Sequence, residues 1–148
     1  MNFLDNWLLL GLCAALLFGL SAVLGKIVVG QKFFGLRPSF AGILFIIGSG
    51  IVLAAFFLSF PAVIPKNPFH IAAGIGVGIL WGIGQVLVLI AVSRNANIAQ
   101  LAPIYNINTL VAVILGIFLL SEIPNQTQTI KIIVGGILIT IGAVLVSG

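Results

Sequence analysis

Long apolar runs, separated by short breaks that contain proline, glycine and charged residues, dominate the chain. Each run has roughly the 20 residues that an α-helix needs to cross the hydrocarbon core of a bilayer. The short alternating segments that are typical of a transmembrane β-barrel do not occur. The pattern therefore predicts an all-α integral membrane protein with a bundle of five transmembrane helices. Their expected positions are about 7–29, 40–63, 71–92, 98–120 and 127–147.

Composition supports the membrane prediction and excludes other classes of protein. Hydrophobic residues make up 61% of the 148 residues and charged residues only 5%, whereas a soluble domain is about 25% charged. A disordered chain would need low hydrophobicity and high net charge. The net charge of +4 comes from six scattered cations and not from a basic face, so no nucleic-acid partner is expected. The expected surroundings are the lipid bilayer.

The chain offers little for enzyme chemistry. It has one histidine, one cysteine and two acids, and the sequence shows no metal-binding cluster, no phosphate-binding glycine loop and no nucleophile with a plausible base. We therefore expect neither an enzyme nor a cofactor or metal. Both acids, Asp5 and Glu122, lie near helix ends, whereas proton-driven carriers usually keep an ionisable group at depth. Uniport or exchange is favoured over tight proton coupling.

Polar residues gather in the helix expected at 98–120. At about 100° per residue, Tyr105, Asn108 and Thr109 lie on one half of that helix and deep in the membrane. Pro103 removes a backbone donor beside them. Two interpretations remain open: an interrupted helix with free carbonyls, as in many transporter sites, or a simple kink or later helix start.

The helix expected at 71–92 combines small residues with two large polar ones. Gly74, Gly78 and Gly82 recur at four-residue spacing, which permits close helix packing. Trp81 and Gln85 share one face near mid-membrane, away from the interfacial belt where tryptophans gather. They either line a cavity or pack against neighbouring helices.

Three segments of the second half form an ordered pattern. Residues 101–110 read LAPIYNINTL, residues 117–122 read IFLLSE, and residues 135–146 read GGILITIGAVLV. This pattern resembles the EamA domain of the drug/metabolite transporter superfamily, in which a proline opens the fourth helix and a glutamate closes it, and two glycines punctuate the fifth. The matching positions are Pro103, Glu122, Gly136 and Gly142. Phe18–Ala22 followed by Lys26 also looks like the family's first helix, so the resemblance covers nearly the whole chain, 1–148, as a single EamA-like membrane domain.

The resemblance implies a transporter of small organic solutes such as metabolites or drugs. Most family members carry two such five-helix domains, inverted relative to each other, with a cavity between them lined by helices one, three and four. This sequence has one domain and hence half of an inverted-repeat transporter. The expected partner is a second copy in an antiparallel homodimer or a homologous five-helix chain. Alternating access by that dimer is the leading hypothesis, and Glu122 is read as structural.

On this hypothesis the cavity is lined by aromatic side chains that enclose an apolar part of the solute and by polar side chains that bind its polar groups. The predicted solute-binding residues are Ser21, Trp81, Gln85, Tyr105, Asn108 and Thr109. The alternative is a non-transporting membrane subunit that assembles with or stabilises a larger complex. Loops after the first and third helices hold four cations against two elsewhere, which weakly favours an outside N-terminus. A prokaryotic inner cell membrane is the expected location.

Overall fold

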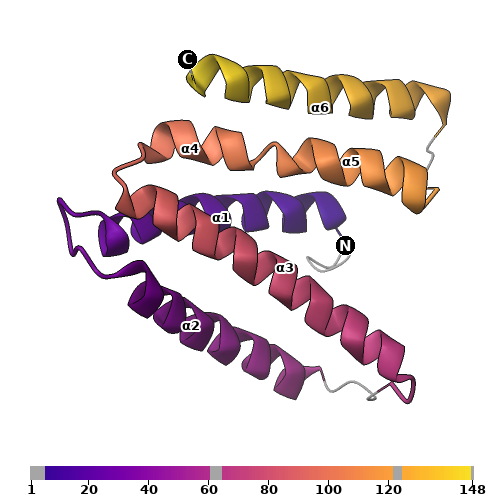
Figure 1. Ribbon diagram of the computed structural model, residues 1–148. Helices are drawn as coiled ribbons and strands as arrows, with labels where there is room; N and C mark the ends of the chain where they lie inside the picture. The colour runs from indigo at the N-terminus through magenta and orange to yellow at the C-terminus, as the bar shows by residue number, and fades with distance from the viewer. Residues whose placement is uncertain (1–5, 61–64, 122–124, 148) are drawn as a thin grey trace. The chain divides into compact units, whose positions relative to one another are not determined.

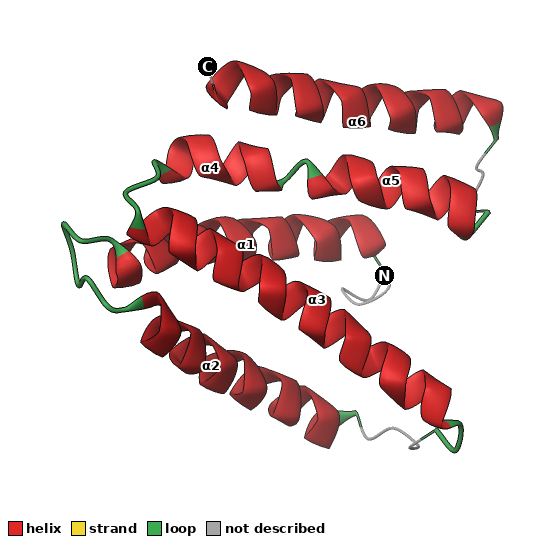
Figure 2. Cartoon of the chain, in the orientation of Figure 1, coloured by secondary structure: helices red, strands yellow, loops and turns green. Residues whose placement is uncertain are grey.

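The computed structural model describes residues 6–60, 65–121 and 125–147 (Figure 1). Helices and connecting loops make up these ranges, and no strand occurs within them (Figure 2). Five helical spans in the described ranges are long and apolar enough to cross a membrane, which confirms the predicted all-α membrane bundle. The helices are α1 (Trp7–Val29), α2 (Pro38–Ser59), α3 (Pro68–Ser93), α4 (Ile98–Tyr105), α5 (Asn108–Leu119) and α6 (Gln126–Ser147).

Two prolines explain where the second and third helices begin. α2 starts at Pro38 and α3 starts at Pro68, each two or three residues before the positions expected from the apolar runs, 40 and 71. Proline suits the first turn of a helix because its missing N–H would have no partner there. Asn67 adds a cap, since its side-chain oxygen accepts a hydrogen bond from the N–H of Phe69 at 2.9 Å.

The chain forms two compact units, residues 1–95 and 96–148. The first unit contains α1, α2 and α3, which converge at one end (Figure 1). Its four most buried apolar residues all lie at that end, because they come from the last turn of α1, the first turn of α2 and the last turns of α3. They are Val29, Ala41, Leu89 and Val92.

Small residues allow this convergence. A Cβ atom added at Gly42 would lie 3.8 Å from Leu89 Cδ1, and one added at Gly25 would lie 3.8 Å from the Phe45 ring. The glycines therefore bring α2 against α3 and α1 against α2 at van der Waals distance. Within this unit nothing comes within 4 Å of a Cβ added at Gly74, Gly78 or Gly82, so packing between its three helices leaves the glycine stripe of α3 unused.

The loop between α1 and α2 folds back on the end of α1. The N–H groups of Phe34 and Leu36 donate to the carbonyls of Ile27 and Val28, at 3.1 and 3.0 Å. Gly35 has a φ of 62°, a left-handed conformation that side chains with a Cβ rarely adopt. The loop is thus a fixed extension of the helix end.

The second unit packs α6 against both α4 and α5. Gly136 is buried in that contact, and a Cβ added there would lie only 3.0 Å from Leu110 Cδ1. Ala143, two turns further along α6, is also buried. Small residues on one face of α6 therefore set how closely it approaches the fourth span, as expected for helix association in a membrane.

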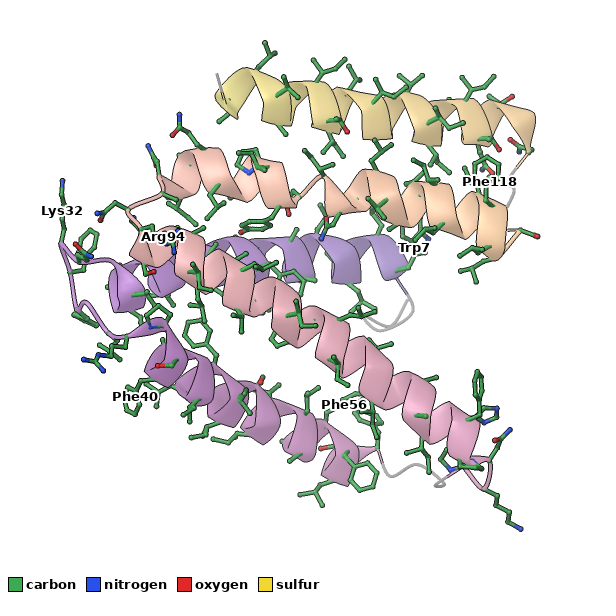
Figure 3. All side chains as sticks on the ribbon, in the orientation of Figure 1. Trp7, Lys32, Phe40, Phe56, Arg94 and Phe118 are labelled. Atoms are coloured by element: carbon green, nitrogen blue, oxygen red, sulfur yellow. The ribbon has the colours of Figure 1, made fainter. Side chains whose placement is uncertain are left out.

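Most of the large apolar side chains project away from the helices (Figure 3). Leu58 and Phe118 are 78% and 79% exposed, for example. In a bilayer this surface contacts lipid tails, which are as apolar as the side chains themselves.

Candidate functional site

The fourth span of 22 residues, Ile98–Leu119, is broken near its middle. α4 passes through Pro103 and ends at Tyr105, and α5 begins at Asn108. Of the two interpretations left open by the sequence, the interrupted helix agrees with the structure, and the break lies after Pro103, at Asn106 and Ile107.

Hydrogen bonds at the break follow a tighter pattern than in an α-helix. The N–H of Ile107 donates to the carbonyl of Ile104 at 3.2 Å, and the N–H of Thr109 donates to the carbonyl of Asn106 at 3.0 Å. Both are i−3 bonds, which replace the regular i−4 bonds to Pro103 and Tyr105. Within the described residues, the carbonyls of Pro103 and Tyr105 therefore lack their usual helical donors.

A third carbonyl is affected by the proline itself. Pro103 has no N–H, so the carbonyl of Ala99 cannot accept the regular bond from that position. Ala99 and Pro103 are four residues apart, so their carbonyls lie on one side of α4. Backbone carbonyls at membrane depth are tolerated only where protein covers them or where they line a water-filled cavity. We therefore expect water, a solute or a polar group of a neighbouring helix to contact the break.

Three of the predicted site residues border the break. Tyr105 is the last residue of α4, and Asn108 and Thr109 are the first two residues of α5. The Thr109 hydroxyl donates to Oδ1 of Asn108 at 3.4 Å. Both of these side chains are exposed, and Tyr105 is half-buried. The amide N–H₂ of Asn108 and the carbonyls of the break thus offer donors and acceptors beside an aromatic ring.

The other three predicted residues belong to the first unit. Trp81 and Gln85 lie one turn apart on the same face of α3, and the indole is 53% exposed. Ser21 is exposed on α1, where its hydroxyl donates to the Phe18 carbonyl at 2.8 Å. That bond uses the donor of Ser21, so the hydroxyl is left to act as an acceptor.

The six predicted residues therefore fall into two groups, one in each compact unit. α1 and α3 run towards the same end of their unit (Figure 1). Ser21 and Trp81 each precede a buried residue, Val29 and Leu89, by eight residues, so each lies about 12 Å along its helix from the buried contacts. In the described ranges no hydrogen bond or ring contact joins Ser21, Trp81 and Gln85.

Sequence reasoning missed the part of the site that the backbone supplies. Asn106, which is not among the predicted site residues, forms the break itself. The signal was present in Asn106 and Asn108, since asparagine is a weak helix former and both follow a proline closely. Asn97 caps α4, since its side-chain oxygen accepts a hydrogen bond from the Ala99 N–H at 3.1 Å. Glu122 lies outside the described residues.

Comparison with protein families gives one finding that agrees with this geometry. Residues 5–148 match the model of the EamA-like transporter family. No significant match was found among curated proteins or solved structures. Because the family match covers almost the whole chain and the described residues form five helical spans long and apolar enough to cross a membrane, the chain is a multi-pass membrane protein that belongs to the EamA-like transporter family.

Proposed function

We propose that the protein carries small organic solutes of the metabolite or drug type across a prokaryotic inner cell membrane by alternating access, as a dimer. The observation that carries the proposal is the interrupted fourth span, with Tyr105, Asn108 and Thr109 at a break half-way along that span. Interrupted helices of this kind line the sites of many secondary transporters, since they present backbone polar groups to a solute. Residues 1–148 would act as one membrane domain, as the continuous family match supports.

The polar groups at the break define the chemistry of the solute. The carbonyls of Ala99, Pro103 and Tyr105 accept hydrogen bonds, so a solute with N–H or O–H groups satisfies them. The amide of Asn108 can bind a carbonyl or hydroxyl of the same molecule. Trp81 adds a broad aromatic face for an apolar portion. A small polar molecule with an apolar part, such as an amino-acid derivative, combines these features.

The energy source is expected to be the solute gradient itself. Both acids of the chain, Asp5 and Glu122, lie outside the described residues, and no described span contains a carboxylate. Ionisable groups at depth are the usual carriers of coupled protons. Solute exchange across vesicles is therefore proposed to proceed without a proton gradient.

Counterflow in proteoliposomes tests the proposed function. Vesicles loaded with one unlabelled solute class at a time are diluted into a trace of the labelled solute, and the expected result is transient uptake that protein-free vesicles lack. A pH jump of either sign should leave the uptake unchanged. Uptake driven uphill by the pH jump would contradict the proposed energetics, and a stable stoichiometric complex with no flux of any solute would favour the subunit hypothesis.

A second five-helix unit of opposite orientation is proposed to complete the cavity, and we favour a second copy of this chain. The glycine stripe of α3 supports a partner helix, because packing inside its own unit leaves Gly74, Gly78 and Gly82 without close neighbours. The small difference of four cations against two between the two sides supports dual orientation, since topology follows the loop that holds more Lys and Arg.

Reporters fused separately to each terminus in cells test this arrangement. We expect signals from both sides of the membrane for the N-terminal fusion and for the C-terminal fusion alike. If each terminus reports on one side only, the chain cannot pair with an inverted copy of itself, and a separate homologous partner takes that place.

A further inference from the structure

Besides the half-buried Lys26 in the last turn of α1, three exposed cations gather at the end where the helices of the first unit converge. Lys32 and Arg37 lie in the loop between α1 and α2, and Arg94 follows the last residue of α3. The buried contacts of Val29, Ala41, Leu89 and Val92 hold these three helix ends together. Lys32 and Arg94 accordingly appear at the same end of the unit in Figure 3. The other end has Lys66 and His70 among its described residues.

These three cations face no carboxylate of the described residues. All three side chains are exposed, and the two acids of the chain, Asp5 and Glu122, are outside the described ranges. Among the described residues of the first unit, the cluster is hence a surface of positive charge without a carboxylate, at the ends of helices long enough to span a membrane. Such a surface attracts anions, most strongly where two guanidinium groups can each bind a phosphate with two hydrogen bonds.

Exposed aromatic rings lie beside the cations. Phe33 and Phe34 are 59% and 71% exposed in the same loop, and Phe40, in the first turn of α2, is 54% exposed. The loop is fixed, since the N–H groups of Phe33 and Gly35 both donate to the Gly30 carbonyl, at 2.9 and 3.2 Å. A Cβ at Gly30 would lie 2.5 Å from the carbonyl oxygen of Lys26, so glycine is needed where the loop leaves the helix.

We propose that this end of the first unit is a binding surface for the headgroups of anionic phospholipids. Arg37 and Arg94 bind the headgroup phosphate through their guanidinium groups. The compact ammonium group of Lys32 is attracted to the same layer of negatively charged headgroups. The phenyl rings enter the acyl region just below, where an apolar side chain gains free energy by leaving water. Because the loop is already ordered, little conformational freedom is lost when lipid binds. The inference does not depend on which solute the protein carries.

Lipid retention measured by native mass spectrometry tests the surface. The full chain, purified in a neutral detergent, is mixed with equal amounts of phosphatidylglycerol and phosphatidylcholine. We expect the wild type to retain phosphatidylglycerol in preference. Neutralising one cation near an anionic surface should weaken binding roughly fivefold, so the triple variant K32Q/R37Q/R94Q should lose about a hundredfold. Phosphatidylcholine retention should stay the same.

A matched variant at the other end provides the control. K66Q/H70Q removes the described basic side chains there, and its preference for phosphatidylglycerol should change by less than about twofold, since its residues lie far from the proposed surface. Equal retention of the two lipids by the wild type, or an equal loss in both variants, would overturn the proposal.

The salt dependence of the wild type's lipid preference tests the proposal even if the triple variant does not fold. For the wild type, raising NaCl from about 0.05 M to about 0.5 M should remove most of the preference, because exposed charges are screened over a few ångströms at high salt. A preference that persists in high salt would contradict a charge-based surface. Inorganic phosphate at about 10 mM should not displace the lipid; displacement would show a simple anion site and overturn the commitment to lipid headgroups.

Discussion

Trp81→Ala is expected to lower the rate of solute exchange in reconstituted vesicles by about 10- to 100-fold. The indole is half-exposed near the middle of α3, where it would cover an apolar part of the solute. Covering a large apolar side chain is worth about 1.5–3 kcal/mol, and about 1.4 kcal/mol corresponds to a factor of ten. The loss should appear as weaker solute binding, measured from the concentration dependence of counterflow.

Trp7→Ala is the matched control, because it removes the same ring from the first residue of α1. An indole at the membrane interface anchors the helix end, so exchange should be nearly unchanged. Asn108→Ala provides an independent test in the other unit, with a loss of about tenfold expected from one unmade hydrogen bond. Should both Trp81→Ala and Asn108→Ala transport at the wild-type rate, the assigned cavity residues are wrong.

Restoring a regular fourth helix should stabilise the protein and abolish most of its transport. In the double variant P103A/N106A the Ala99 carbonyl regains its donor, and two weak helix formers are replaced by the strongest one. Proline in a helix interior costs about 3 kcal/mol relative to alanine, so the thermal unfolding midpoint in detergent should rise. The rate of solute exchange should fall more than about tenfold, because the carbonyls at the break would then accept hydrogen bonds within the helix and would no longer bind the solute.

Pro68→Ala separates this effect from proline removal in general. Pro68 occupies the first turn of α3, where proline costs little, so both the unfolding midpoint and the exchange rate should stay close to wild type. If P103A/N106A is more stable and still exchanges solute at full rate, the break does not belong to the transport path.

The apolar pattern determined the helices well because membrane spans obey a strong length rule. Residues 7–29 were predicted for the first helix, and α1 occupies Trp7–Val29. The predicted starts of α2 and α3 lay two or three residues too late. The limits of the apolar runs do not take into account that proline favours the first turn of a helix. For the fourth span the apolar run of residues 98–120 did not show by itself where the helix breaks; the weak helix formers Asn106 and Asn108 after Pro103 carried that signal, and the i−3 hydrogen bonds there show the outcome.

The candidate site was harder to predict than the fold. Side-chain polarity pointed to Tyr105, Asn108 and Thr109, which do border the break. Backbone carbonyls, however, exist at every position, and only the hydrogen-bond pattern shows which of them are free. Trp81, Gln85 and Ser21 remain predictions, because helical spacing assigns a face to each residue but does not reveal what that face meets.

The buried contacts of the first unit all lie at one end of its helices. The helices can therefore tilt about that end, which acts as a pivot. Val29, Ala41, Leu89 and Val92 fix the pivot. A tilt of about 10° there would move a helix by about 2 Å at the depth of Trp81, and by about 5 Å at the far end of a helix that is roughly 30 Å long. A tilt of this kind would widen the spacing between the helices at the far end of the unit and leave their spacing at the pivot nearly unchanged.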